Sequence, residues 1–287
     1  MKRSLLIALT VLLSLNGINA QTNSKELKFI SFNIRTGSAW ATAADGDNCW
    51  ANRRKAVVDM IQAERPDAIG LQEAVLEQVH YLDSVLAGAY SRIGVGRDDG
   101  RDDGEFMCIY YRRDRLELLD GKTYWLSPTP DSVSFGWDAA CRRTVTIGRF
   151  RDRATDSTIV YLNTHLDHVG PQARRNSVFL LCSLADQYNS TVVLGGDMNS
   201  GISDSIFHPL VHHQLIDARQ NANVTDNADT YNAYGHGPSH QIDHFFVKLK
   251  PGSRGILAFR TLNGNYGVPY ISDHYPVVTV INPYIKQ

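Results

Sequence analysis

Oxygen-bearing and imidazole side chains stand at or just beyond one end of several short apolar segments of this sequence. Asn33, Glu73 and Asp273 offer hard oxygen ligands, which suit magnesium, manganese or calcium better than zinc. His165 and His274 lie far apart in the sequence, so they can flank a substrate as general acid and general base. The set predicts an enzyme with a divalent-metal cofactor, Mg²⁺ first, with Mn²⁺ or Ca²⁺ as alternatives.

Three further side chains indicate which kind of bond such an enzyme breaks. Asp197 and Asn199 add a carboxylate and an amide, and Arg143 supplies a planar guanidinium fork that matches a phosphate. Together with an oxygen-bound metal and two imidazoles, they predict phosphoryl-ester hydrolysis. Because nothing in the pattern resembles a covalent nucleophile, the predicted attacker is a water activated by the metal and a base.

Segments with the composition of buried β-strands position these side chains. If the strands lie side by side in sheets, their polar tips converge on one rim, where α/β proteins usually place their sites. Apolar residues at helical spacing predict helices over 50–61, 75–86 and 172–188 between the strands. The strand segments are residues 29–32, 68–71, 159–162, 191–194, 245–247 and 270–271.

The first residues have the pattern of a secretory signal. Lys2 and Arg3 precede an apolar run from Leu5 to Leu15, and small residues lead to Ala20. The run is too short for an ordinary membrane-spanning helix, so no transmembrane anchor is expected. We therefore predict a signal peptide over 1–20, a single domain over 21–287 and a secreted or periplasmic location.

The charge balance bears on the partner. Without Lys2 and Arg3, 27 basic residues stand against 30 acidic ones, a formal charge of −3. A protein that holds nucleic acid mainly through its phosphates carries an excess of basic residues. The predicted partner is therefore a phosphorylated small molecule, sugar or lipid headgroup. Nucleic acid is not favoured, and no protein partner is inferred.

The four cysteines are too few for a disulfide scaffold. Cys108 and Cys182 lie in apolar runs and are expected to pack in the core as free thiols. Cys49 and Cys141 lie in loop-like regions, and whether they form a disulfide stays open.

Six motifs follow one another along nearly the whole chain after the signal. In this order they resemble the endonuclease/exonuclease/phosphatase superfamily, which includes DNase I, apurinic endonucleases, neutral sphingomyelinases and inositol polyphosphate 5-phosphatases. The resemblance implies an α/β fold, a four-layered α-β-β-α sandwich of two packed mixed sheets with outer helices. The motifs are Ser31-Phe32-Asn33-Ile34-Arg35, Leu71-Gln72-Glu73, Asn163-Thr164-His165-Leu166-Asp167-His168, Gly196-Asp197-Met198-Asn199, Ile242-Asp243-His244 and Ser272-Asp273-His274-Tyr275-Pro276.

The resemblance also implies roles for the metal and for the base. Asn33 and Glu73 correspond to the metal-binding pair, with Asp273 contributing nearby. His274 corresponds to the base that takes a proton from water. Asp243 corresponds to the carboxylate that fixes the tautomer of that base and stabilises its imidazolium.

The remaining roles concern the phosphoryl group. His165 corresponds to a second histidine that contacts the phosphate, and Glu105 stands where DNase I-like members place the carboxylate partner of that histidine. Asp197 and Asn199 match the pair that positions the nucleophile or leaving group and the phosphoryl oxygens. Arg143 lies where DNase I has an arginine near the phosphate, and the adjacent Arg142 competes for that role.

Other segments resemble an uncharacterised secreted bacterial subgroup of the superfamily. They include 46–54, 94–100 and 137–140. DNase I places a phosphate-contacting tyrosine just before the Glu105 position, but Asp103 stands there, which argues against duplex-DNA cleavage. The leading hypothesis is a secreted metal-dependent phosphodiesterase or phosphomonoesterase. The alternatives are a secreted DNA or RNA nuclease and a catalytically silent protein that binds a phosphorylated ligand.

Two long loops are expected to shape the pocket and its specificity. Residues 38–48 hold Trp40, and 127–140 hold Phe135 and Trp137. These aromatic rings either stack on a sugar or a base, or only pin their own loops.

Overall fold

The computed structural model describes residues 25–285, so the predicted signal peptide over 1–20 lies outside the described residues. The strands form two six-stranded sheets. The order in the first sheet is β11-β12-β1-β2-β4-β3, where β1 and β2 run parallel and the other neighbours antiparallel. Its strands are β1 (Leu27–Asn33), β2 (Ala68–Gln72), β3 (Tyr90–Ile93), β4 (Ile109–Arg112), β11 (Ser253–Thr261) and β12 (Val277–Ile285).

The second sheet repeats this mixed arrangement. Its order is β5-β6-β7-β8-β10-β9, and only β7 and β8 run parallel. One parallel pair therefore lies near the middle of each sheet. The strands are β5 (Leu116–Trp125), β6 (Thr144–Asp152), β7 (Thr158–His165), β8 (Thr191–Asp197), β9 (Ile216–Asp217) and β10 (Asp243–Lys248).

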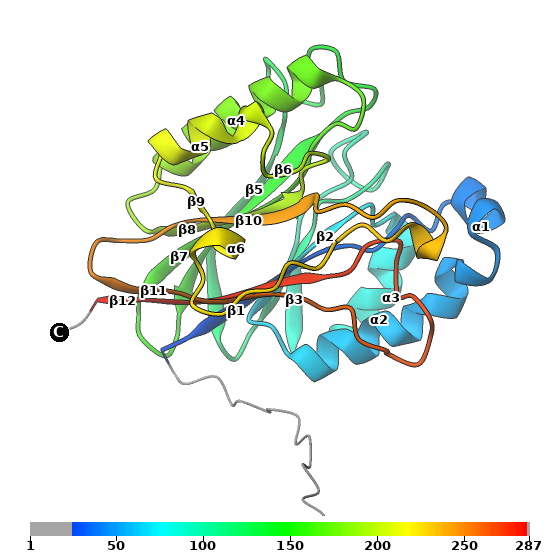
Figure 1. The fold of residues 1–287 in the computed structure, drawn as a ribbon, viewed down its shortest axis with the longest axis horizontal. Coiled ribbons are helices and arrows are strands. Elements are labelled where there is room, and N and C mark those ends of the chain that lie inside the picture. Colours follow the sequence, from blue (N-terminus) through cyan, green and yellow to red (C-terminus); the bar gives the residue numbers. More distant parts are fainter. Residues whose placement is uncertain (1–24, 286–287) are drawn as a thin grey trace, which may run out of the picture.

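Helices cover the outer faces of the two sheets. In Figure 1, α2 (Trp50–Glu64) and α3 (Leu76–Leu86) lie on one side of the molecule, and α4 (Pro171–Asp186) and α5 (His208–His212) lie on the other. Within residues 25–285, no helix is both long and apolar enough to cross a bilayer. The shorter helices are α1 (Ala39–Asp45), α6 (Ala218–Asn221) and the single turns η1 (Gly46–Asn48), η2 (Ser205–Phe207) and η3 (Ala233–Gly235).

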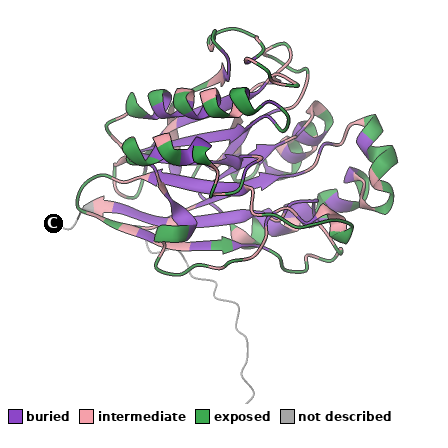
Figure 2. Cartoon of the chain, turned by 45° about the horizontal axis from the view of Figure 1, so that its top comes forward, coloured by how far each residue is buried: buried purple, intermediate pink, exposed green. Residues whose placement is uncertain are grey.

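Three apolar clusters hold these layers together. One packs α2 and α3 on the first sheet, and another packs α4 and α5 on the second. The third lies between the sheets and includes Phe29, Tyr161 and Phe245. Central strands are buried on both faces, which explains their continuous apolar runs, whereas the helices expose their outer sides (Figure 2). The predicted four-layered sandwich of two mixed sheets is confirmed.

The predicted elements agree with the structure except for one strand segment. The three amphipathic patterns form α2, α3 and α4, and five of the strand segments lie in β1, β2, β7, β8 and β10. Residues 270–271 form a loop instead, ahead of β12. The loop is held by other segments, because the carbonyl of Ile271 accepts a hydrogen bond from Arg53 (2.7 Å) and that of Asp273 accepts one from the N–H of Asn232 (2.7 Å).

Candidate active site

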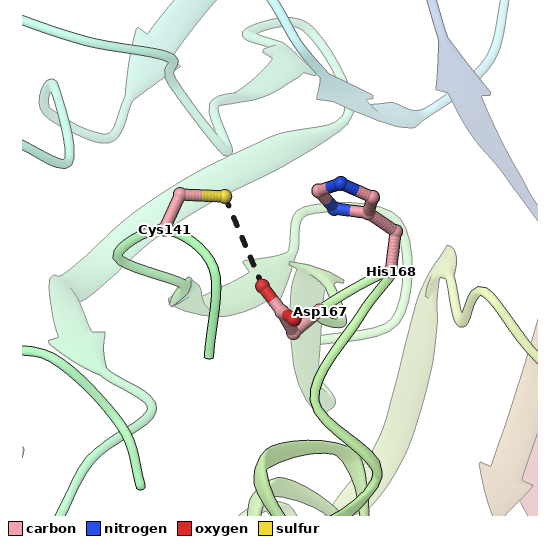
Figure 3. Close-up of side chains that lie close together, drawn as sticks. All are labelled: Cys141, Asp167 and His168. Carbon is pink, nitrogen blue, oxygen red and sulfur yellow. Dashed lines mark hydrogen bonds between the residues drawn. The ribbon is translucent and has the colours of Figure 1, made fainter. Parts of the chain in front are cut away.

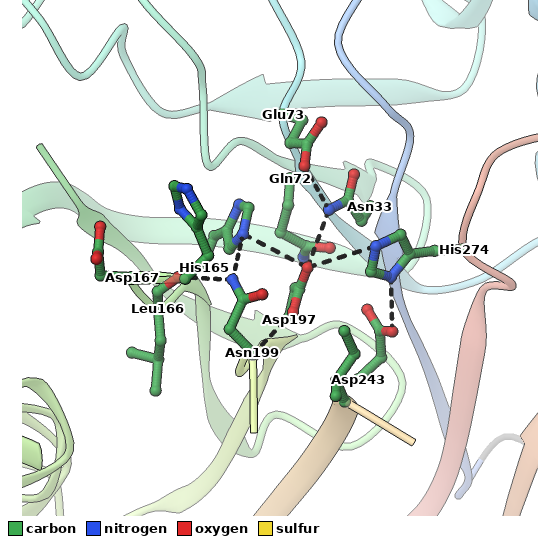
Figure 4. A network of polar contacts seen from close by, with 12 residues as sticks. Asn33, Gln72, Glu73, His165, Leu166, Asp167, Asp197, Asn199, Asp243 and His274 are labelled. Carbon is green, nitrogen blue, oxygen red and sulfur yellow. Dashed lines mark hydrogen bonds and ion pairs between the residues drawn. The ribbon is translucent and has the colours of Figure 1, made fainter. Parts of the chain in front are cut away.

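The ends of strands from both sheets meet at one rim, as the sequence predicts. β1 ends at Asn33, β7 at His165 and β8 at Asp197, and β10 begins at Asp243. Strand register brings three of these residues together, since His165 lies opposite Asp197 and Asp197 lies opposite Asp243. Packing of the two sheets then brings Asn33 to the same place (Figure 4).

Asp197 lies at the centre of the polar network. Its Oδ2 accepts a hydrogen bond from Nδ2 of Asn33 (3.0 Å) and lies 3.4 Å from Nε2 of His165 and 3.7 Å from Nε2 of His274. Burial raises the pKa of Asp197 to about 7, with His274 opposing the shift and Asp243 adding to it. The carboxyl group can therefore exchange a proton near neutral pH.

His274 is oriented by a buried carboxylate. Its Nδ1 lies 2.8 Å from Oδ2 of Asp243, so Nδ1 carries the proton and Nε2 points toward Asp197. Burial disfavours the imidazolium, but the carboxylates of Asp243 and Asp197 outweigh burial and raise the pKa of His274 well above its ordinary value. The arrangement is that of a base whose protonated form is strongly stabilised.

His165 has the opposite electrostatic environment. Its Nε2 accepts a hydrogen bond from Nδ2 of Asn199 (2.9 Å), which also donates to the carbonyl of Leu166 (2.9 Å). Burial, Arg143 and Arg97 hold the pKa of His165 well below its ordinary value, so the ring is neutral. Its Nδ1 is buried without a hydrogen-bond partner, although the residue as a whole lines the cavity.

Hard oxygen atoms gather beside His274. Nδ2 of Asn33 donates to Oε1 of Glu73 (2.9 Å), and the N–H of Thr36 donates to Oε2 (3.1 Å). Burial raises the pKa of Asp273, with His274 opposing and Glu73 adding to the shift. Carboxylates that repel one another in this way fit a divalent cation, which would be held by Asn33, Glu73 and Asp273. Ligand atoms of Asp197, Asp243 and His274 also lie within 4.8 Å of one another. Because Asp243 and His274 already share a hydrogen bond, this group suits proton transfer better than metal binding.

Arg143 belongs to a second cluster, which Figure 3 shows in part. Its Nε donates to Oδ2 of Asp167 (3.3 Å) and its Nη2 to Nδ1 of His168 (2.9 Å). Cys141, Asp167 and His168 could geometrically hold a metal, but a guanidinium already bonded to two of them repels a cation. Arg142 turns away to Asp98 (3.2 Å), so Arg143, which lines the cavity, is the better placed of the two arginines.

The predicted pairing of Glu105 with His165 is wrong. Nη1 of Arg97 lies 2.5 Å from Oε2 of Glu105, and His165 Nδ1 has no partner. The loop before Glu105 folds back on itself, with the N–H of Arg97 bonded to the carbonyl of Glu105 (3.1 Å), and this brings the arginine to the carboxylate. Glu105 still lines the cavity, together with Arg97, which the sequence did not single out.

A cavity of about 680 Å³ is lined by most of these candidate side chains, although Asn33 and Asp243 are not among its lining residues. Arg35, Tyr231 and His240 also line it, and Trp40 does so from the 38–48 loop as expected. Trp137 is not among the described lining residues. A larger hollow of about 830 Å³ lies where β7 and β8 begin, at the end of these strands remote from His165 and Asp197, and it contains none of the catalytic candidates.

The loops of the rim are strained and tightly anchored. Arg35, Glu73 and Asn199 have positive φ angles of 56°, 62° and 47°, which non-glycine residues seldom adopt. The buried Arg53 of α2 ties the loops together, because its guanidinium donates to the carbonyls of Asn48 (2.5 Å), Ile34 (2.9 Å) and Ile271 (2.7 Å). The four cysteines are free thiols, so Cys49 and Cys141 are not joined.

Comparisons with known proteins agree on one family. A model of the Endonuclease/Exonuclease/phosphatase family matches residues 30–274. A Bacteroides vulgatus endonuclease/exonuclease/phosphatase is 31% identical with a TM-score of 0.83, covering 90% of this chain and 99% of the other. A Bacteroides thetaiotaomicron mannosyl-6-phosphatase is 31% identical with a TM-score of 0.81, covering 89% and 99%. An uncharacterized protein of Acanthamoeba polyphaga mimivirus is 28% identical over 194 residues, 62% of this chain and 69% of the other.

Proposed function

Because this chain belongs to the endonuclease/exonuclease/phosphatase family, whose members hydrolyse phosphoesters, we propose that it is a divalent-metal-dependent phosphoesterase. The observation that carries the proposal is that oxygen ligands for a metal lie next to a histidine–carboxylate pair. Carboxylates of Glu73 and Asp273 line the cavity beside a His274 imidazole held 2.8 Å from the Asp243 carboxylate, and Asn33 is buried against Glu73 (2.9 Å). The proposed metal is Mg²⁺ or Mn²⁺, because both favour oxygen ligands.

The side chains divide the work of an attack by water. A divalent cation, when bound, neutralises charge on the phosphoryl group. His274 takes the proton of the attacking water at Nε2, and Asp243 stabilises the imidazolium that results. The Asp273 carboxylate helps to raise the pKa of His274, so a cation held by Asp273 would lower that pKa and favour the neutral form that the base needs.

The other groups position the phosphoryl group. Asp197 lies within 4 Å of both histidines and orients the water between them. Asn199 and neutral His165, which both line the cavity, face the phosphoryl oxygens. Arg143 neutralises the remaining charge from the Asp167 side of the cavity.

A small phosphorylated molecule, in particular a sugar phosphate, is the proposed substrate. The formal charge of −3 after residue 20 does not favour a polyanion, and one similar structure is a mannosyl-6-phosphatase. The signal-like residues 1–20 support a proposed location in the periplasm or outside the cell. Mass spectrometry of protein recovered from the medium or periplasm should give a mature amino terminus near Gln21.

The test is hydrolysis of p-nitrophenyl phosphate and bis(p-nitrophenyl) phosphate by purified protein with Mg²⁺ or Mn²⁺. We expect hydrolysis of at least one substrate, its loss in EDTA and its recovery when metal is restored. Full activity in EDTA, or an unchanged rate for His274→Ala, would refute the proposed chemistry.

A further inference from the structure

Trp40 is a large aromatic side chain exposed at the catalytic cavity. It is 62% exposed although it lines the hollow that contains His165 and His274. Near His165 the cavity is lined by charged groups that pair with one another, whereas near Asp273 it is lined by the rings of Trp40 and Tyr231. An apolar ring held open to water at a polar site is suited to cover by a ligand.

The Trp40 ring is fixed relative to the proposed metal ligands. The guanidinium of Arg35 lies over the ring, 5.0 Å from its centroid. Arg35 is in turn held by two hydrogen bonds to Asp45 (3.0 and 3.1 Å), at the other end of α1, and lies 3.9 Å from Asp273. One face of the indole is therefore supported from within the protein, and the side chain does not need to be ordered when a ligand arrives.

The loop that carries this tryptophan is anchored to the first sheet and to α3. Gln78 accepts a hydrogen bond from the N–H of Gly37 (2.8 Å) and donates one to the carbonyl of Arg35 (3.0 Å). Gly37 is packed against the same side chain, since an added Cβ would lie 3.0 Å from Gln78. The backbone just before the Trp40 loop is therefore held to α3.

Which ligand fits follows from what surrounds the ring. A nucleobase is usually gripped between two aromatic or apolar groups, whereas a sugar ring has one apolar face and hydroxyl groups around its edge. Arg35 covers one face of the Trp40 ring, while the rings of Tyr231 and the exposed His240, which also line the cavity, stack on each other. Trp40 therefore has one free aromatic face, with the polar atoms of Arg35, Tyr231 and His240 lining the same cavity, and this arrangement matches a sugar ring better than a base gripped from both sides.

We propose that Trp40 is a specificity residue, a platform on which the pyranose ring of a sugar-phosphate substrate stacks while its phosphate reaches His165 and His274. This inference rests on the proposed phosphoesterase function. It adds that the alcohol part of the ester is cyclic and lies on the Asp273 side of the cavity.

Two substrates separate a platform from a structural residue. Mannose 6-phosphate and glycerol 3-phosphate are both esters of primary alcohols, but only the first has a ring. Trp40→Ala is expected to lower kcat/KM for mannose 6-phosphate at least 10-fold and for glycerol 3-phosphate less than 2-fold, and Trp40→Phe should retain most of the selectivity. Trp137→Phe, in the other long loop, is the matched control and should change neither.

A binding measurement keeps the inference distinct from the catalytic proposal. Mannose 6-phosphate should change the tryptophan fluorescence of the wild type and of Trp137→Phe, but not of Trp40→Phe. An equal loss for both substrates in Trp40→Ala would mean that the ring only supports its loop. A larger effect on adenosine monophosphate than on mannose 6-phosphate would assign the platform to a base. If no phosphoester is hydrolysed, the proposed function fails, while the titration still decides whether the ring binds a sugar phosphate.

Discussion

Replacing Asp243 by Asn tests the assignment of the catalytic base most directly. The change preserves the shape of the side chain but removes the charge that lies 2.8 Å from Nδ1 of His274. At an effective dielectric constant near 20, two unit charges at that distance attract by about 6 kcal/mol. Asp197, 3.7 Å from Nε2, still faces the imidazolium, so only part of that attraction is lost from the transition state.

We therefore expect kcat to fall by about 10² to 10⁴, or about 2.7–5.5 kcal/mol of transition-state stabilisation. KM should change little, because Asp243 is buried behind His274 and does not line the cavity. The assay is steady-state hydrolysis of p-nitrophenyl phosphate at saturating Mg²⁺. Oδ1 of Asp243 is buried without a partner, so an amide N–H placed there costs about 1–3 kcal/mol of stability, and thermal unfolding must accompany the kinetics.

The chain offers a matched control for this experiment. Asp186 and His213 form another carboxylate–imidazole pair, 2.5 Å apart, but Asp186 is exposed, His213 is only half-buried, and both lie outside the cavity. Asp186→Asn should leave kcat unchanged. If a folded Asp243→Asn protein keeps kcat within about threefold of the wild type, the pair does not stabilise the transition state. The reasoning from its geometry would then be wrong.

Three further predictions concern metal, packing and pH. Glu73→Gln should raise the Mg²⁺ concentration needed for half-maximal activity at least about 10-fold, and an unchanged metal titration would contradict its role as a ligand. Gly70→Ala would place a Cβ 2.5 Å from the Asn163 side chain between the sheets, so urea unfolding should show a loss of about 1–3 kcal/mol, whereas Gly88→Ala, with nothing within 4 Å, is the control. Burial opposes ionisation of Asp167, but backbone N–H groups hold its pKa at about 2, below the ordinary 3.8. Its carboxylate therefore contributes stability that is present above pH 3.8 and lost as the pH falls through about 2, so the stability difference between wild type and Asp167→Asn should shrink over that range.

Most of the rim could be predicted because a strand end fixes where its next side chain lies. Buried runs that end in Asn33, His165 and Asp197 leave little freedom once the sheets are formed, and the motifs supply the order. The predicted family membership is confirmed, whereas the roles of the individual residues stay predictions.

The parts of the candidate site that the sequence did not predict lie in loops. Arg97 reaches the cavity only because its loop folds back, with Gly104 at a φ of 80° and Gly96 so close to Asp103 that a Cβ there would lie 2.2 Å from its carbonyl oxygen. Side-chain spacing alone does not reveal such a fold. The same loop places Glu105 beside an arginine instead of beside His165.

Asp273 shows a related limit of sequence patterns. Residues 270–271 have strand-like composition, but the carbonyl of Ile271 bonds to a buried arginine, which only the tertiary structure reveals. His274 forms just an isolated bridge with Tyr231. The proposed metal ligand Asp273 and the proposed base His274 are thus held by a loop whose hydrogen bonds come from other parts of the chain.

Arg53 has a consequence for how the rim opens. Its one guanidinium satisfies carbonyls at Ile34, at Ile271 and at Asn48, the last at the end of the Trp40 loop. None of these segments can swing outward without leaving a buried cation short of acceptors, so they should behave as one cooperative unit in amide hydrogen exchange. Shared opening energies in the wild type, and separate ones in Arg53→Met, would mean that the loop with Trp40 and the loop with Asp273 open together.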